Sequence, residues 1–118
     1  ALGKLEPFIA EAFSRENYLE WHRRHRPDVV VTTHEPIPLW LQQVGLRVPE
    51  DVAYVHLDCT PAHGDYAGID QQPEQVGAAA VDSLVEQINQ NRRGVPEVPK
   101  SVLIEGNWRE GPTFPRGA

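Results

Sequence analysis

The sequence has a single cysteine, Cys59, so no disulfide bond can form within the chain. A lone thiol fits the reducing environment of the cytoplasm. Long hydrophobic runs are also missing, and none approaches the roughly 20 apolar residues that a membrane-spanning helix needs. Residues 1–13 lack a charged segment followed by a long apolar stretch, so we expect no signal peptide. These absences favour a cytoplasmic protein that has no membrane partner.

Positive charge is in deficit, because 17 acidic residues outnumber 11 lysines and arginines and the formal net charge is −6. Binding to duplex DNA usually needs a basic patch that displaces counterions from the phosphates. The densest basic stretch, at 22–26 (HRRHR), is short and typical of a solvated helix end. We therefore expect that this chain alone does not bind nucleic acid.

Catalytic and metal-binding motifs are absent from the sequence. It contains no nucleophile elbow, no phosphate-binding or dinucleotide-binding glycine loop, and no zinc motif. The negative charge of Asp58 raises the pKa of the neighbouring Cys59 thiol and disfavours it as a nucleophile. His22 and His25 fall in the apolar stripe of a predicted helix, where packing explains them better than metal binding. We expect a protein that is not an enzyme and has no catalytic residues, no metal and no cofactor.

Apolar periodicity indicates that strands and helices alternate along the chain. Helices are predicted at 15–26, 36–44 and 73–91, and strands at 28–32, 52–57, 68–70 and 100–105, with a short edge strand at 5–10. Ser14, Pro27 and Gly45 are typical helix-boundary residues. The β-branched run at 28–32 is typical of a strand buried on both faces. This order predicts an α/β fold with a mainly parallel sheet and flanking helices.

Polar clusters follow two of the predicted strands, at 33–35 (THE) and 58–60 (DCT). In parallel sheets, ligands bind beyond the carboxyl ends of the strands. The Asp58 carboxylate is suited to accept hydrogen bonds from vicinal hydroxyls or an amine, or it caps the following turn. His34 and Glu35 either line the same cleft or cap the helix that begins at Pro36. The residues alone leave these alternatives open.

The aromatic residues Trp21, Trp40 and Tyr54 occupy predicted core positions of helices and a strand. Trp108 lies in a polar tail, where core packing is still the favoured interpretation. The alternative is that Trp108 stacks on a ligand or covers the edge of a lobe.

Several segments resemble the LacI/GalR family of transcriptional regulators. Residues 45–53 (GLRVPEDVA), running into 56–58 (HLD), resemble the family segment GxxVPxDVAVVGFDD. Upstream, residues 26–31 (RPDVVV) resemble its RPDAV strand. Downstream, the segments 69–71 (IDQ) and 74–77 (EQVG) resemble the stretch that opens a long helix, and 102–105 (VLIE) and 109–110 (RE) resemble the closing strands.

The resemblance implies a two-lobed, periplasmic-binding-protein-like (class I) domain that holds a small-molecule effector, typically a sugar, in its cleft. By the same resemblance, Asp58, His34, Glu35 and Gln71 match positions that contact effector or cross between lobes. The sequence departs from the family where His34 replaces Asn, His56 replaces Gly and Cys59 replaces Asp. These departures leave the chemical identity of the effector open.

The implied function is allosteric control of repression, in which operator DNA binds only through a helix-turn-helix domain that is absent from this chain. Two alternatives are a periplasmic sugar-binding protein of a transporter and, with less support, a small α/β enzyme. The motif at 45–53 favours the regulator.

The resemblance also implies a truncated chain. Residues 1–70 match the C-terminal lobe, 71–106 a helix and strand of an incomplete second lobe, and 107–118 a closing strand and tail. The apolar side of the helix at 73–91 then lacks its sheet, so it either folds back or packs on another copy. We expect a homodimer, to which the loop 61–66 adds a further contact.

Overall fold

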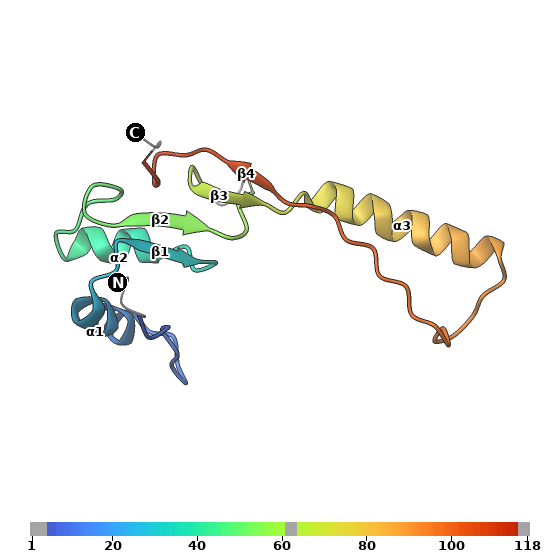
Figure 1. Cartoon of the computed structure of the whole chain (residues 1–118), viewed down its shortest axis with the longest axis horizontal. Coiled ribbons are helices and arrows are strands. Elements are labelled where there is room, and N and C mark those ends of the chain that lie inside the picture. Colours follow the sequence, from blue (N-terminus) through green and yellow to red (C-terminus); the bar gives the residue numbers. More distant parts are fainter. Residues whose placement is uncertain (1–4, 61–63, 116–118) are drawn as a thin grey trace.

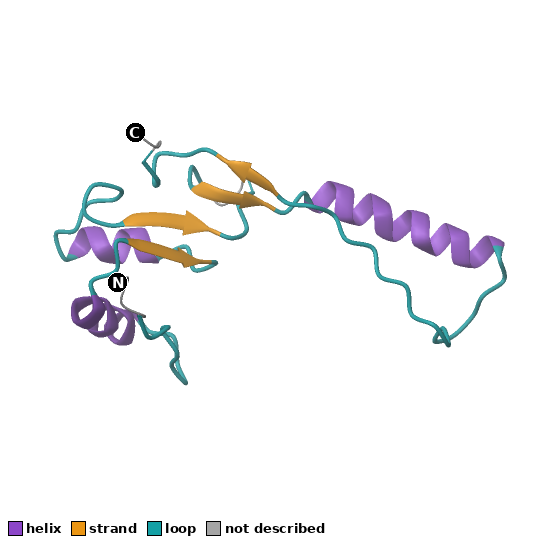
Figure 2. Ribbon diagram, in the orientation of Figure 1, coloured by secondary structure: helices purple, strands orange, loops and turns teal. Residues whose placement is uncertain are grey.

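The computed structural model describes residues 5–60 and 64–115, and its sheet confirms the predicted α/β fold (Figures 1 and 2). The helices are α1 (Arg15–His25), α2 (Ile37–Gln43) and α3 (Pro73–Asn89). The strands are β1 (Val29–Thr32), β2 (Ala53–His56), β3 (Ala67–Asp70) and β4 (Asn107–Arg109). They lie side by side in the order β1-β2-β3-β4, with β1, β2 and β3 parallel and β4 antiparallel to β3.

The boundaries of α1 and α2 follow from local chemistry and confirm the sequence prediction. The Ser14 hydroxyl accepts a hydrogen bond from the backbone N–H of Asn17 at 3.2 Å, which caps the start of α1. Helix α1 ends at Arg26, which adopts a left-handed conformation just before Pro27. Gly45 follows α2 with φ +84°, a conformation that costs glycine nothing.

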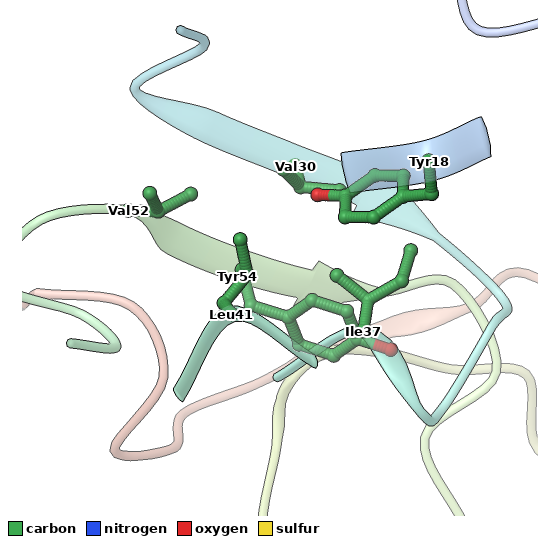
Figure 3. Packing of buried hydrophobic residues seen from close by; sticks show 6 residues of the cluster. All are labelled: Tyr18, Val30, Ile37, Leu41, Val52 and Tyr54. Atoms are coloured by element: carbon green, nitrogen blue, oxygen red, sulfur yellow. The ribbon is translucent and has the colours of Figure 1, made fainter. Parts of the chain in front are cut away.

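The hydrophobic core lies between one face of the sheet and helices α1 and α2 (Figure 3). Its buried members come from all these elements: Tyr18, Val30, Ile37, Leu41, Val52 and Tyr54. Trp21 and Trp40 pack against this cluster as partly buried side chains. The predicted core roles of Trp21, Trp40 and Tyr54 are therefore confirmed.

Strand β1 is not buried on both faces, and that prediction is wrong. Val30 points into the core, but Val29 and Val31 are 41% and 56% exposed. The reason is that β1 is an edge strand whose helices cover one face only. The β-branched run predicted the strand correctly but could not show that one face lacks a covering layer.

Two predicted strands, at 5–10 and 100–105, do not form. The first segment runs irregularly beside α1, and its Glu6 carbonyl accepts a hydrogen bond from the Trp21 indole at 3.1 Å. The second is an extended arm that pairs with no strand among the described residues, and its Leu103 is 92% exposed. A β-strand is defined by its neighbour, and neither segment has one.

Helix α3 and the arm form an excursion that leaves the sheet after β3 and returns at β4 (Figure 1). None of the 17 residues of α3 is buried. The two ends of the excursion are joined by a hydrogen bond from the Gln72 side-chain amide to the Glu105 carbonyl at 2.5 Å. The radius of gyration is 19.4 Å, against about 13 Å for a compact chain of this length. The helix therefore does not fold back over the sheet.

The C-terminal tail closes the sheet through Thr113, which is buried. Its hydroxyl donates to the Tyr54 carbonyl at 2.8 Å and accepts from the Ala67 N–H at 2.9 Å. The predicted core packing of Trp108 is wrong, because this side chain is half-exposed and meets Phe114 edge-to-face at 5.7 Å.

Across the described residues, no helix has both the length and the apolar character to span a membrane.

Candidate functional site

The four predicted site residues all follow the carboxyl ends of neighbouring parallel strands. Strand pairing aligns Thr32 at the end of β1 with His56 at the end of β2, and His56 with Gly68 in β3. The next residues are 33–35 (THE) after β1, 57–58 (LD) after β2 and 71 (Q) after β3. We call this the carboxyl edge. Parallel sheets commonly bind ligands at this edge, so the carboxyl edge is the candidate site.

His34 is fixed at the carboxyl edge by its backbone and by aromatic neighbours. Its N–H donates to the Thr32 hydroxyl at 3.1 Å, and its carbonyl accepts from the Tyr54 hydroxyl at 2.9 Å. The half-buried imidazole lies 4.0 Å from the ring centre of Phe13 and 5.2 Å from that of Trp40. A polar ring thus stands beside two aromatic surfaces.

Glu35 is exposed in the turn between β1 and α2. The N-cap of α2 is Pro36, which contributes no side-chain cap. Neither His34 nor Glu35 therefore occupies the N-cap position, and the capping alternative loses its main support.

Asp58 is half-buried and is positioned by His56. The Asp58 backbone N–H donates to Nδ1 of His56 at 3.1 Å, so this ring nitrogen acts as the acceptor. His56 itself is fully buried, stacked on Tyr66 with ring centres 5.8 Å apart and 6.1 Å from Tyr54. The histidine that departs from the family's glycine therefore shapes the turn that carries Asp58.

Cys59 ties this turn to β3 and is buried. Its N–H donates to the Ile69 carbonyl at 2.7 Å, and its Sγ donates to the His56 carbonyl at 3.4 Å. Burial raises the pKa of the Cys59 thiol, with the Asp58 charge adding to the effect. Gly68 lies opposite, where an added Cβ would sit 1.8 Å from the His56 carbonyl oxygen. The thiol is structural, in agreement with the argument against a nucleophile.

Gln71 sits at the crossing from the sheet to the excursion. Its exposed side-chain amide donates to the Leu57 carbonyl at 2.7 Å, next to Asp58. Gln71 and Leu57 also line a cavity of about 670 Å³ between the sheet end, α3 and the arm. Gln71 therefore links the loop after β2 to the start of the excursion.

The sequence interpretation missed Phe13, His56 and the Tyr54 hydroxyl as parts of this edge. Phe13 lies in a segment without regular structure, so no periodicity could place it beside His34. The apolar stripe assigned Trp40 to the core, and it does pack there while also reaching His34. A ligand at the carboxyl edge would meet aromatic faces as well as polar groups.

Within residues 5–60 and 64–115, no group of three or more histidine, cysteine or acidic side chains is arranged to hold a metal ion.

The family model of a periplasmic binding protein-like domain matches residues 4–112, which is most of the chain. The matched range includes the three parallel strands, the carboxyl edge and α3. No curated protein and no solved structure matches the chain.

Proposed function

The chain belongs to the family of periplasmic binding protein-like domains, and we propose from this that it is the effector-binding part of a LacI-type transcriptional regulator. The family is one of ligand-binding domains, so the chemistry assigned to the chain is recognition of a small molecule, without a catalytic step. The segment 45–53 (GLRVPEDVA), which leads into β2 and Asp58, supports the regulator assignment.

The observation that carries the proposal is that the predicted site residues follow the ends of three neighbouring parallel strands, with two aromatic rings beside His34. The Asp58 carboxylate accepts hydrogen bonds from hydroxyls, and the His34 imidazole both donates and accepts. Phe13 and Trp40 supply apolar faces beside His34. A compact polyhydroxylated molecule such as a sugar combines these two demands, and in this proposal Glu35 and Gln71 bind its further hydroxyls.

In this proposal, residues 1–70 form the C-terminal lobe, 71–106 the incomplete second lobe, and 107–118 the closing strand and tail. Operator DNA is contacted through a separate helix-turn-helix domain, because the net charge of this chain is −6. Effector binding would shift the DNA affinity of a cytoplasmic homodimer. Neither a cofactor nor a membrane partner enters the proposal.

The second candidate is a solute-binding protein of a transporter. The family description is compatible with it, because it covers domains that resemble periplasmic binding proteins. Both candidates use the same carboxyl edge, so ligand binding alone does not separate them. Joining the chain to a DNA-binding domain and measuring operator affinity with and without ligand would do so.

The experiment that tests ligand binding is isothermal titration calorimetry of the chain against a panel of monosaccharides. Asp58→Ala should weaken the affinity for the sugar that binds by at least about tenfold, because a hydrogen bond to a charged group is worth roughly 1.5–3 kcal/mol. Asp82→Ala, an equally charged change on exposed α3, is the matched control and should leave affinity unchanged. An unchanged affinity in Asp58→Ala would contradict the assignment of this edge.

A further inference from the structure

A second cavity, of about 860 Å³, lies at the end of the sheet opposite the carboxyl edge, the end farther from α3 (Figure 1). Its walls are α1, the loop 26–28 before β1, the residues that follow α2, and the residues 51–52 before β2. We call it the amino-edge cavity. All of its lining residues lie between 15 and 52, so neither the excursion nor the four predicted site residues after Thr32 form it. Its volume is typical of small-molecule sites.

The inner wall of the amino-edge cavity is aliphatic. It is formed by side chains from α1, from the residues after α2 and from the approach to β2: Leu19, Val44, Leu46 and Val52. Val52 belongs to the buried core and is only 3% exposed, so the cavity reaches down to the core. Such a wall favours an apolar ligand, which loses its contact with water there.

His22 is the buried polar side chain of this cavity. It lines the cavity from α1 and is only 6% exposed. Its Nδ1 lies 3.2 Å from the Tyr18 hydroxyl, whereas its Nε2 has no hydrogen-bond partner among the described residues. Burial lowers the pKa of His22, so the ring is neutral at pH 7. Nε2 is therefore available to a ligand, as donor or acceptor according to the tautomer.

The charges around the amino-edge cavity cancel one another. Some of the lining charges are already paired, Arg15 with Glu16 at 3.8 Å and Asp51 with Arg47 at 2.9 Å. The lining residues that make no ion pair with a described residue are two cations and two anions: Arg23, Arg26, Glu20 and Asp28. A charged ligand would meet repulsion as well as attraction and would lose its hydration. A neutral ligand avoids both costs.

We propose that the amino-edge cavity binds a neutral, apolar molecule that carries a hydroxyl group, with a phenol as the simplest example. The aliphatic wall covers the ring of the ligand, and the hydroxyl forms a hydrogen bond with Nε2 of His22. A hydroxyl both donates and accepts, so it suits either tautomer of the imidazole. For a ligand of about ten heavy atoms, we expect a dissociation constant of about 10 μM to 1 mM.

Fluorescence anisotropy of 2-naphthol, excited where tryptophan does not absorb, tests the proposal on the 118-residue chain. The anisotropy should rise to saturation, and Val44→Glu should weaken binding at least about tenfold by placing a charge in the aliphatic wall. Leu39→Glu is the matched control, because Leu39 is similarly exposed but does not line this cavity. No saturable binding up to about 1 mM, or binding that Leu39→Glu removes and Val44→Glu spares, would overturn the proposal.

Matched naphthalene derivatives test the class of ligand. The anion 2-naphthoate and the cation 2-naphthylmethylamine should each bind several-fold more weakly than 2-naphthol. His22→Phe should weaken the binding of 2-naphthol about two- to tenfold, which is the effect of one neutral hydrogen bond. His22→Gln should retain more of the affinity, because its amide offers both a donor and an acceptor. Tighter binding of either charged derivative, or undiminished binding by a folded His22→Phe chain, would contradict the assignment.

The location of the site is tested with a variant of the carboxyl edge. Asp58→Ala should leave the affinity for 2-naphthol unchanged, because Asp58 follows the opposite end of β2. Loss of 2-naphthol binding in Asp58→Ala would place the probe at the carboxyl edge and would overturn the proposal. These outcomes do not depend on whether the carboxyl edge binds a sugar.

Discussion

The sheet lobe, meaning β1–β4 with α1, α2 and the C-terminal tail, and the α3 excursion use similar apolar residues with opposite results. In the lobe, Leu41 of α2 is completely buried against β2, whereas Leu84 of α3 is 56% exposed. The difference is not composition or helix pattern but the presence of a sheet face beside α2. An apolar stripe thus predicts a helix and its inward side, while burial depends on what the rest of the fold supplies.

The largest difference in stability between the two regions is expected from substituting one glycine in each. Gly68→Ala places a Cβ 1.8 Å from the His56 carbonyl oxygen, so β2 and β3 must move apart. We expect a loss of about 4 kcal/mol or more, enough to unfold the lobe. Gly77→Ala meets nothing and should raise helix content, with a gain of up to about 1 kcal/mol. Urea denaturation and circular dichroism of dilute samples measure the stability and helix content of both variants. Equal changes in stability would contradict the contrast between the sheet lobe and the excursion.

The next largest changes in stability are expected from leucine-to-alanine substitutions. Leu41→Ala should cost about 3 kcal/mol through lost burial and the cavity left behind. Leu84→Ala should change stability by less than about 0.5 kcal/mol at concentrations where the chain is monomeric. Thermal and urea unfolding of dilute protein provides the measurement. A large effect of Leu84→Ala in the monomer would mean that α3 packs within its own chain.

Removing a polar contact should also cost more stability in the sheet lobe than in the excursion. Thr113→Val keeps the side-chain shape but removes hydrogen bonds to Tyr54 and Ala67, and we expect a loss of about 2 kcal/mol. Lys100→Ala removes the exposed ion pair with Glu86, 3.2 Å long, and should cost less than about 0.5 kcal/mol. The midpoints of urea unfolding measure both losses of stability. A larger loss in Lys100→Ala than in Thr113→Val would contradict this prediction.

The smallest effect is a pH dependence confined to the lobe. Burial lowers the pKa of His22 below its usual 6.5, so the unfolded chain binds a proton more readily than the folded one. Stability should therefore be full above pH 6.5 and decline as the pH falls below it. His22→Gln, which can still accept a hydrogen bond from the Tyr18 hydroxyl, should flatten this decline. Unfolding midpoints between pH 5 and 8 test it, and identical slopes would exclude His22 as the cause.

Local chemistry in the sequence was enough for the helix boundaries and the order of elements. Ser14, Pro27 and Gly45 act on their immediate neighbours, and β2 was identifiable because it is buried on every side. The family resemblance and the strand order also placed the predicted site residues at one edge. Their role in binding stays a prediction.

Features that depend on distant neighbours could not be predicted. The exposure of Val31, the unpaired arm around Leu103 and the position of Phe13 beside His34 all depend on what lies across space. The bond from the Asp58 N–H to His56 depends on the exact course of a loop. Periodicity describes one element at a time, so it cannot report a missing layer or a meeting of irregular segments.

The pairing of Asp70 with Asn107 across β3 and β4 makes the excursion an insertion within a β-hairpin. A two-residue Asn-Gly turn could join these strands in place of residues 71–106. The free-energy cost of loop closure, which comes from lost chain entropy, would be roughly 2–3 kcal/mol smaller for the two-residue turn than for residues 71–106. The sheet lobe is therefore closed by β4 across a long connection that the strand pairing itself does not require.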